Sequence, residues 1–175
     1  MAFQSTVRFD TAFGVPGEII VDGLRRVETG FLKSANPAYN IVGATVYTRP
    51  VGGGPVAAGG AIGTTRVFAG ILCNPKTYAS LGNVTGGGPL APTMTLPNDI
   101  NAELCITTSG MVVFVGHACN IGDQLVYDTT TGAINTIAPG ATPAAGTALV
   151  PNATIGRNPQ TTATGGVALA ILANS

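Results

Sequence analysis

The sequence predicts an all-β protein, either a β-sandwich of the jelly-roll type or a short β-barrel, with long Gly/Pro loops and an N-terminal arm. Three observations predict this class. Short β-branched segments recur along the whole chain. The 175 residues include 25 glycines and 12 prolines, which supply turns. No stretch combines an apolar stripe at helical spacing with a cap and the length of a typical helix.

Nine segments are expected to form strands, because each is rich in β-branched or apolar residues and ends at turn residues. They are residues 18–22, 41–48, 66–73, 103–107, 111–115, 121–128, 133–137, 153–157 and 167–172. Residues 108–110 (TSG) and 129–132 (TTTG) are expected to close two hairpins, since each offers a glycine for positive φ. Residues 75–81 are the best candidate for one or two helical turns, with proline at the start and glycine just after. The Gly/Pro loops are residues 50–63, 82–97 and 138–151.

Charge is distributed unevenly along the chain. Half of the charged residues precede residue 34, whereas residues 129–175 contain only Arg157. We therefore expect residues 1–35 to form a charged N-terminal arm that packs on neighbours or is exchanged with them, and residues 36–175 to form a single β domain.

Composition excludes several function classes. The formal net charge is zero, and a nucleic-acid-binding protein needs clustered cations to displace counterions from phosphates. The first twenty residues lack the apolar run of a signal peptide, and the longest apolar stretch, residues 167–173, is too short to span a bilayer. We expect neither nucleic acid nor a membrane as a partner.

Candidate catalytic and metal-binding residues are few. A nucleophile–base pair would use His117, the single histidine, with Ser109, Cys105 or Cys119, but the local pattern matches no known nucleophile motif. A zinc site would need His117 and Cys119 joined by the distant Cys105 or Cys73. We expect no catalytic residue, no metal and no cofactor. The three cysteines are expected to be buried free thiols, with one disulfide and a spare thiol as the alternative.

The remaining candidates have structural explanations. The carboxylates of the C-terminal two-thirds are Asp99, Glu103, Asp123 and Asp128. The three aspartates occur at loop edges or turns, where an Asp side chain commonly accepts hydrogen bonds from nearby backbone N–H groups. The glycine clusters at 52–54 and 86–88 lack the lysine and the helix of a phosphate loop. The positive signal is physical. Only 9% of the residues are charged, so the surface invites association, and copies of the chain or a host scaffold are expected to cover it. The alternative from composition is a soluble module that relies on Thr, Asn and Gly for hydration, since the chain contains 23 threonines.

Three blocks of sequence resemble the structural cement (capsid decoration) proteins of tailed bacteriophages. The first comprises residues 1–4 (MAFQ), 13–18 (FGVPGE) and 21–23 (VDG). The second is residues 68–79 (FAGILCNPKTYA), and the third is residues 120–128 (NIGDQLVYD) followed by Thr131-Gly132. The blocks occur in order over most of the chain, and they consist of turn and core residues.

This resemblance implies a non-enzymatic homotrimer, made in the bacterial host cytoplasm and located in the virion. It would bind the major capsid protein outside the head, at three-fold and quasi-three-fold positions, and stabilise contacts between capsid subunits. Arg8, Arg25, Arg26 and Lys33 are the candidate ion-pairing contacts with the shell or between protomers. Two alternatives remain from the residues alone, a carbohydrate-type ligand-binding β-module on a virion or cell surface and a hydrolase using His117.

Overall fold

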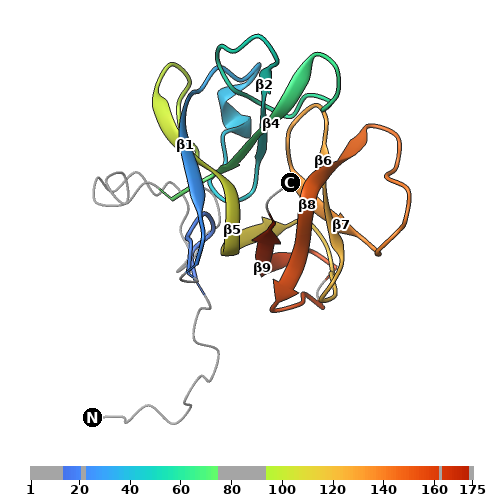
Figure 1. Cartoon of the computed structure of the whole chain (residues 1–175). Helices are drawn as coiled ribbons and strands as arrows, with labels where there is room; N and C mark the ends of the chain where they lie inside the picture. Colours follow the sequence, from blue (N-terminus) through green and yellow to red (C-terminus); the bar gives the residue numbers. More distant parts are fainter. Residues whose placement is uncertain (1–13, 21–22, 75–93, 162, 174–175) are drawn as a thin grey trace, which may run out of the picture.

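The computed structural model describes residues 14–20, 23–74, 94–161 and 163–173. Its strands are β1 (Arg26–Phe31), β2 (Val46–Pro50), β3 (Ala57–Ala58), β4 (Arg66–Leu72), β5 (Asn101–Val115), β6 (Gln124–Asp128), β7 (Ile134–Ile137), β8 (Thr147–Arg157) and β9 (Gly166–Leu172). A 3-10 turn, η1 (Pro37–Tyr39), follows β1. The antiparallel sheet has the order β3-β2-β4-β5-β9-β8-β6-β7, and β1 pairs with β5 (Figure 1).

These elements confirm the predicted all-β class. The strand path has two ends, β3 and β7, which do not pair with each other in the described part of the chain, so the sheet is not closed into a barrel. This arrangement is consistent with the sandwich alternative. No described helix has the length and apolarity that crossing a membrane would need.

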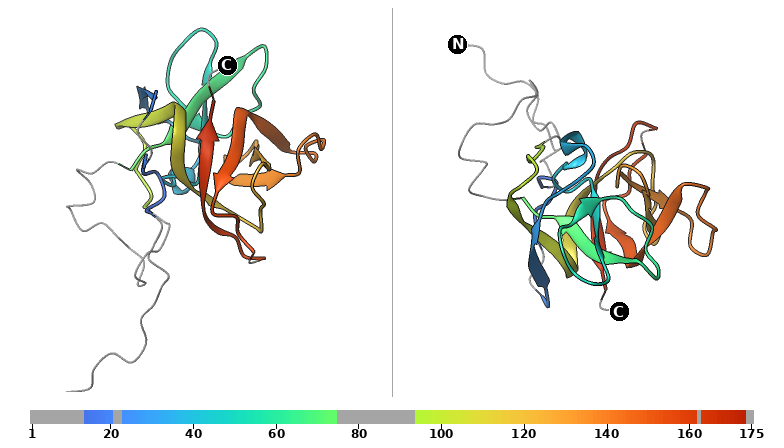
Figure 2. Two further views of the ribbon diagram at one scale, coloured as in Figure 1. Left: turned by 60° about the horizontal axis from the view of Figure 1, so that its bottom comes forward. Right: turned by 90° about the horizontal axis from the view of Figure 1, so that it is seen from above.

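The long strand β5 connects the two parts of the domain. Its first half pairs with β1 and β4, and its second half pairs with β9. The hairpin predicted at residues 108–110 is therefore wrong. The Thr-Ser-Gly sequence instead coincides with an irregularity in the β5–β9 pairing, between Thr108 and Met111, where β5 continues without reversing. In both views of Figure 2, β6 to β9 (orange to red) lie to the right of β5 (olive).

Part of each of the strands β2, β4 and β5 is buried on both faces of the sheet. Their alternate side chains enter two hydrophobic clusters: Val46, Ile71 and Cys105 lie in the larger one, and Tyr47, Leu72 and Leu104 in the smaller one. Strands β6 to β9 complete the larger cluster, whereas connecting segments that contribute Leu32, Val42, Val56 and Leu96 complete the smaller one. This double burial explains why the sequence of β4 is an apolar run rather than an alternation.

The predicted turn at residues 129–132 is confirmed, because β6 and β7 pair directly across it. Asp128 holds this turn: its carboxylate accepts hydrogen bonds from the N–H groups of Thr130 (2.9 Å) and Thr131 (2.7 Å). These bonds keep the pKa of Asp128 below its ordinary value. Gly132 has φ +78° and lies against Val46, where a Cβ atom would be 2.6 Å from the Val46 carbonyl oxygen. The turn between β6 and β7 therefore packs against the start of β2.

Other boundaries differ from expectation. Residues 147–151, predicted as loop, form the first part of β8, and residues 57–58 within another predicted loop form β3. Of the predicted strand at residues 18–22, the described residues 18–20 contain one bridge, between Ile19 and Met111, and residues 21–22 lie outside the described part. The candidate helix at residues 75–81 lies outside the described residues.

Candidate interaction surface

The chain contacts β5 in two stretches, first at residues 17–20 and then along β1. Gly17 N donates to Val112 O (2.8 Å), Val112 N to Glu18 O (2.8 Å), and Ile20 N to Gly110 O (3.2 Å). Strand β1 then pairs with residues 101–107 of β5. In Figure 1, β1 lies beside β5.

Strand β1 exposes its apolar side chains and turns the charged residue Glu28 inward, the reverse of the usual arrangement. Gly30 faces the smaller cluster so closely that a Cβ atom would lie 2.7 Å from Leu104 Cδ1 and 2.9 Å from Val56 Cγ2. Glu28 shares this inward face, since side chains alternate along a strand. Val27, Thr29 and Phe31 consequently point outward, with Val27 38% and Phe31 42% exposed.

Exposed apolar side chains gather on this segment. Among the described residues, ten large apolar side chains are markedly exposed, and five of them fall between residues 15 and 31. We call these five, together with Arg25, Arg26 and Lys33, the N-terminal surface; they are Val15, Ile20, Leu24, Val27 and Phe31. Leu24 is the most exposed, at 93%. Exposed apolar groups concentrated in one segment make that segment a candidate for an interface.

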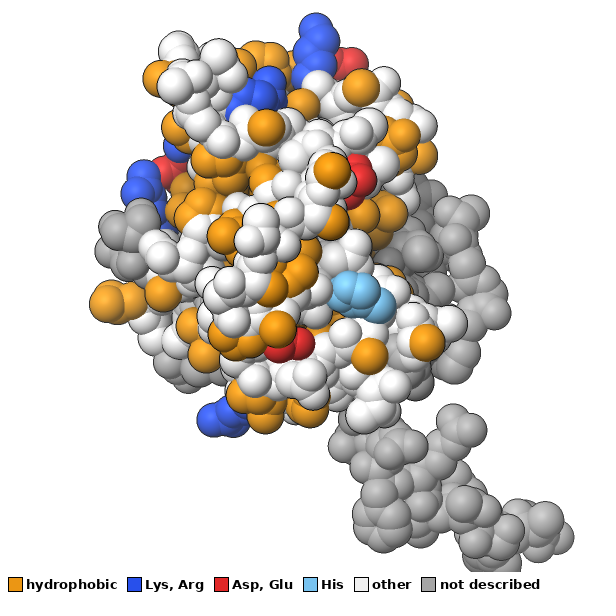
Figure 3. Space-filling model, turned by 90° about the vertical axis from the view of Figure 1, so that its right-hand side faces the viewer, with side chains coloured by type: hydrophobic (Ala, Val, Ile, Leu, Met, Phe, Trp, Pro, Cys, Tyr) orange, Lys and Arg blue, Asp and Glu red, His pale blue; other side chains and the backbone are white. Residues whose placement is uncertain are grey.

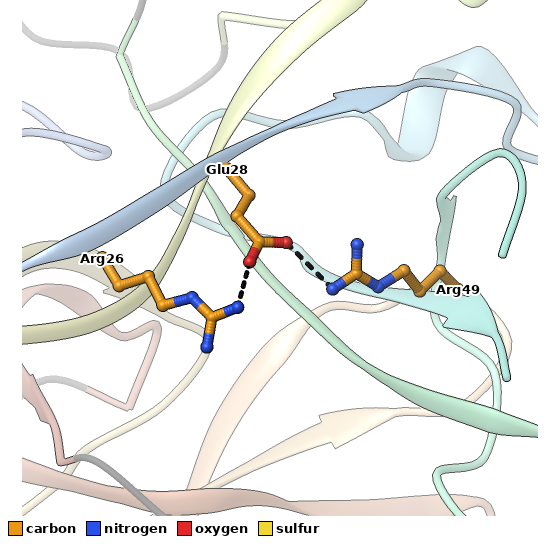
Figure 4. A network of polar contacts seen from close by, with 3 residues as sticks. All are labelled: Arg26, Glu28 and Arg49. Carbon is orange, nitrogen blue, oxygen red and sulfur yellow. Dashed lines mark hydrogen bonds and ion pairs between the residues drawn. The ribbon is translucent and has the colours of Figure 1, made fainter.

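The predicted cationic contacts have different environments. Arg26 and Arg49 both donate to the Glu28 carboxylate, Arg49 at 2.9 Å (Figure 4). Partial burial opposes ionisation of Glu28, but these two guanidinium groups hold its pKa below the ordinary value. Within the described part of the chain, Arg25 and Lys33 are exposed and form no ion pair.

Arg8 and Arg49 complete this charged group. Arg8 lies outside the described residues. Sequence reasoning missed Arg49, because its position at the end of β2 gives no indication that the chain brings β2 to Glu28 of β1. Two guanidinium groups around one carboxylate leave an excess positive charge at this site.

A buried polar network anchors the chain just beyond β1. Asn40 is fully buried, and its Oδ1 accepts hydrogen bonds from Ser34 Oγ (2.6 Å) and Tyr47 OH (3.0 Å). Its Nδ2 donates to Leu96 O (3.0 Å) and Asn98 Oδ1 (2.9 Å). Burial raises the pKa of Tyr47, so its hydroxyl remains a donor. The network holds the chain at Ser34, directly after the exposed Lys33.

Among the described residues, no hydrogen bond links His117 to Ser109, Cys105 or Cys119. The histidine is exposed, and the described residues contain no group of three or more His, Cys, Asp or Glu placed to bind a metal.

The three cysteines are buried and free, which confirms the expectation of buried free thiols. The neighbouring Cys105 thiol and burial both raise the pKa of the Cys73 thiol. Asp123 has a turn role, because its carboxylate accepts from Asn120 N (2.8 Å).

A cavity of about 350 Å³ lies between η1, β5 and β7. Tyr39 and Phe114 contribute its aromatic groups, and its lining contains no charged side chain. The hydroxyl groups of Thr45 and Thr131 already donate within the chain, to Tyr39 O and to Asp128 Oδ1. The cavity thus offers few free polar groups for a sugar.

The surface as a whole is poor in charge. Figure 3 shows a face on which apolar and uncharged polar side chains predominate and charged groups are scattered. This matches the low charged fraction of the sequence, and a weakly charged surface favours association with other protein chains.

Comparison with known proteins identifies a family. A family model described as "Structural cement protein (E217 gp24/Pam3 gp6)" matches residues 3–173. A solved structure, "The capsid of Myoviridae Phage XM1", is similar over 99% of this chain and 99% of that chain, with 20% sequence identity and a TM-score of 0.59. That structural likeness concerns the fold. No curated protein matches.

The predicted resemblance is therefore confirmed. A structural cement protein has a structural role in the virion capsid, which implies binding to capsid proteins and a non-enzymatic function. The match extends over nearly the whole chain, so both the N-terminal surface and the β domain fall within it. The chain belongs to the structural cement protein family of bacteriophages.

Proposed function

We propose that this protein binds the outside of the phage head as a homotrimer, at three-fold and quasi-three-fold positions, and stabilises contacts between major capsid subunits. It is made in the host cytoplasm and needs no nucleic acid, membrane or cofactor to act. The observation that carries the proposal is the family match over residues 3–173. The exposed apolar groups of the N-terminal surface support it, because they supply area to bury against neighbours.

The mechanism follows from the pressure of packaged DNA, which strains the joints between capsid subunits. A protein that binds across a joint adds buried area there, and the joint cannot open without losing it. Each copy needs only modest affinity, because a trimer that engages several subunits at once gains orders of magnitude in avidity.

The exposed cations are our candidates for contact with the shell. Arg25 and Lys33 are available because they form no ion pair within the described residues, whereas Arg26 is already bound to Glu28. A surface ion pair is worth at most about 1 kcal/mol, but three protomers multiply the contribution. Arg8 belongs to the same proposal by its sequence position.

The test adds purified protein to expanded shells that lack it. We expect wild-type protein to bind and to raise the melting temperature of the shells. The double variant Arg25→Glu, Lys33→Glu is expected to bind at least about tenfold more weakly, a loss of about 1.4 kcal/mol. Arg157→Glu is the matched control, since Arg157 is also exposed but lies at the end of β8.

The outcomes separate the two parts of the proposal. Wild-type protein that neither binds such shells nor raises their melting temperature contradicts the cement function. Wild-type binding that the double variant retains in full supports the cement function and removes Arg25 and Lys33 from the contact.

A further inference from the structure

Among the described residues, no strand pairs with the outer edge of β1. Leu32 N donates to Ile100 O (2.9 Å), and by alternation Gly30 and Glu28 also bond to β5. The N–H and C=O groups of Val27 and Thr29 therefore point away from β5. Among the described residues, no segment pairs along this side between Arg26 and Gly30. An open strand edge beside exposed apolar side chains is a site for adding another strand.

The first thirteen residues have the sequence pattern of such a strand. All five large apolar residues occupy odd positions, and both charged residues occupy even positions. The odd positions hold Met1, Phe3, Val7, Phe9 and Phe13 together with Ser5 and Thr11, and the even positions hold Gln4, Thr6, Arg8 and Asp10 together with Ala2 and Ala12. A period of two is typical of a strand with one apolar face. We propose that residues 1–13 of a second copy of this chain add to the open edge of β1 as an antiparallel strand.

Charge selects the register of this pairing. With Arg8 opposite Glu28, Asp10 lies opposite Arg26, so both pairs have opposite charges. Asp10 then also offsets the excess positive charge around Glu28, where Arg26 and Arg49 converge. A slip of two residues one way places Arg8 opposite Arg26, and a slip the other way places Asp10 opposite Glu28. Each slip sets like charges against each other.

The same register matches the apolar faces. Phe9 lies opposite Val27 and Val7 opposite Thr29, on the outward face where Val27 and Phe31 are exposed. A slip of one residue would turn every apolar side chain of the added strand to the other face. The apolar pattern thus fixes which face of the added strand turns outward, and charge selects one alignment among those that keep this face.

The chain geometry favours a second copy over fold-back of the same copy. The register places Phe13 opposite Gly23, which lies at Ser109 of β5. Gly14 lies beside Val112, three residues further along β5. The arm of the same copy would therefore start away from Gly23 and pair out of this register. Thirteen extended residues span up to about 43 Å, which is ample to reach a neighbour.

Disulfide trapping tests the proposal without a shell, so its result is independent of the cement function. A tagged Phe9→Cys chain is mixed with an untagged Val27→Cys chain at tens of micromolar and oxidised. Directly opposite residues in a bonded pair are about 5.5 Å apart between Cα atoms, which suits a disulfide. We expect a disulfide-linked heterodimer on a non-reducing gel, and wild-type chain is the blank because its cysteines are buried.

The controls test register and source. Val7→Cys mixed with Val27→Cys is expected to cross-link at least about tenfold more slowly, because those residues are diagonal neighbours in this alignment. Asp10→Arg in the Phe9→Cys chain should slow trapping, and Arg26→Glu in the partner chain should restore it. The proposal is overturned if the mixture gives no heterodimer above the Val7→Cys control. It is also overturned if a chain that carries both Phe9→Cys and Val27→Cys is linked only within itself.

Discussion

Replacing Asn40 with alanine is expected to lower the free energy of unfolding by about 3 to 5 kcal/mol, a large part of the total stability of a domain. The substitution removes one side chain but takes a hydrogen bond from each of four partners, the buried groups of Ser34, Tyr47 and Leu96 and the half-buried Asn98. Each buried polar group left unsatisfied costs about 1 to 3 kcal/mol, and some of the four can find water or one another. Chemical denaturation monitored by circular dichroism measures the change.

The matched control for this substitution is Asn36→Ala. Asn36 is exposed, and its side chain accepts one hydrogen bond, from Ala38 N (3.0 Å), at the start of η1. Its loss is expected to cost about 1 kcal/mol or less. Similar losses for the two variants would contradict the view that the Asn40 network holds the end of β1.

Replacing Gly43 with alanine is expected to cost about 3 kcal/mol or more, from two sources that can be separated. Gly43 has φ +66°, a conformation that costs an L-residue about 1 to 2 kcal/mol. In addition, its Cβ atom would lie 2.0 Å from Gly17 N and 2.4 Å from the carbonyl carbon of Pro16, so that backbone must move. Hydrogen exchange should then show faster exchange at Gly17, whose N–H bonds to Val112.

Gly140→Ala separates the two sources. Gly140 has φ +77°, but a Cβ atom there would have no atom within 4 Å. This variant should therefore lose only the conformational part, about 1 to 2 kcal/mol, with unchanged exchange at Gly17. Equal losses for Gly43→Ala and Gly140→Ala would show that the segment around Pro16 is not packed against Gly43 as described.

Much of the fold could be predicted from sequence because its core strands have strong local signals. Residues 66–73 and 121–128 contain β4 and β6, and both overlap blocks that carry the family resemblance. The turn after β6 was predictable because Asp128 and Gly132 supply the carboxylate and the positive φ that such a turn requires.

Strand β1 was missed because its apolar residues face outward. The usual interpretation assigns an alternating apolar set to the core, but here the inward positions are Glu28 and Gly30. The sequence also cannot show that Glu28 meets Arg49, since that contact depends on how β1 and β2 are brought together. Such a reversed pattern is expected where a face is reserved for a partner.

Two further features could not be predicted, because each depends on partners that are distant in the sequence. A Thr-Ser-Gly sequence is a good turn locally, yet the different partners of the two halves of β5 keep the chain extended through it. Asn40 resembles an ordinary turn residue after Pro37–Tyr39, and only its distant partners Leu96 and Asn98 make it a core residue. Residues 1–13, which include Arg8, lie outside the described residues, so their roles stay predictions.

A density map of the intact phage particle tests the central claim most directly. Our account predicts density for this chain on the outer surface of the head, three copies around each three-fold and quasi-three-fold position, with the N-terminal surface buried against neighbours. A map that shows the chain elsewhere in the particle, or the head surface without it, would contradict the account.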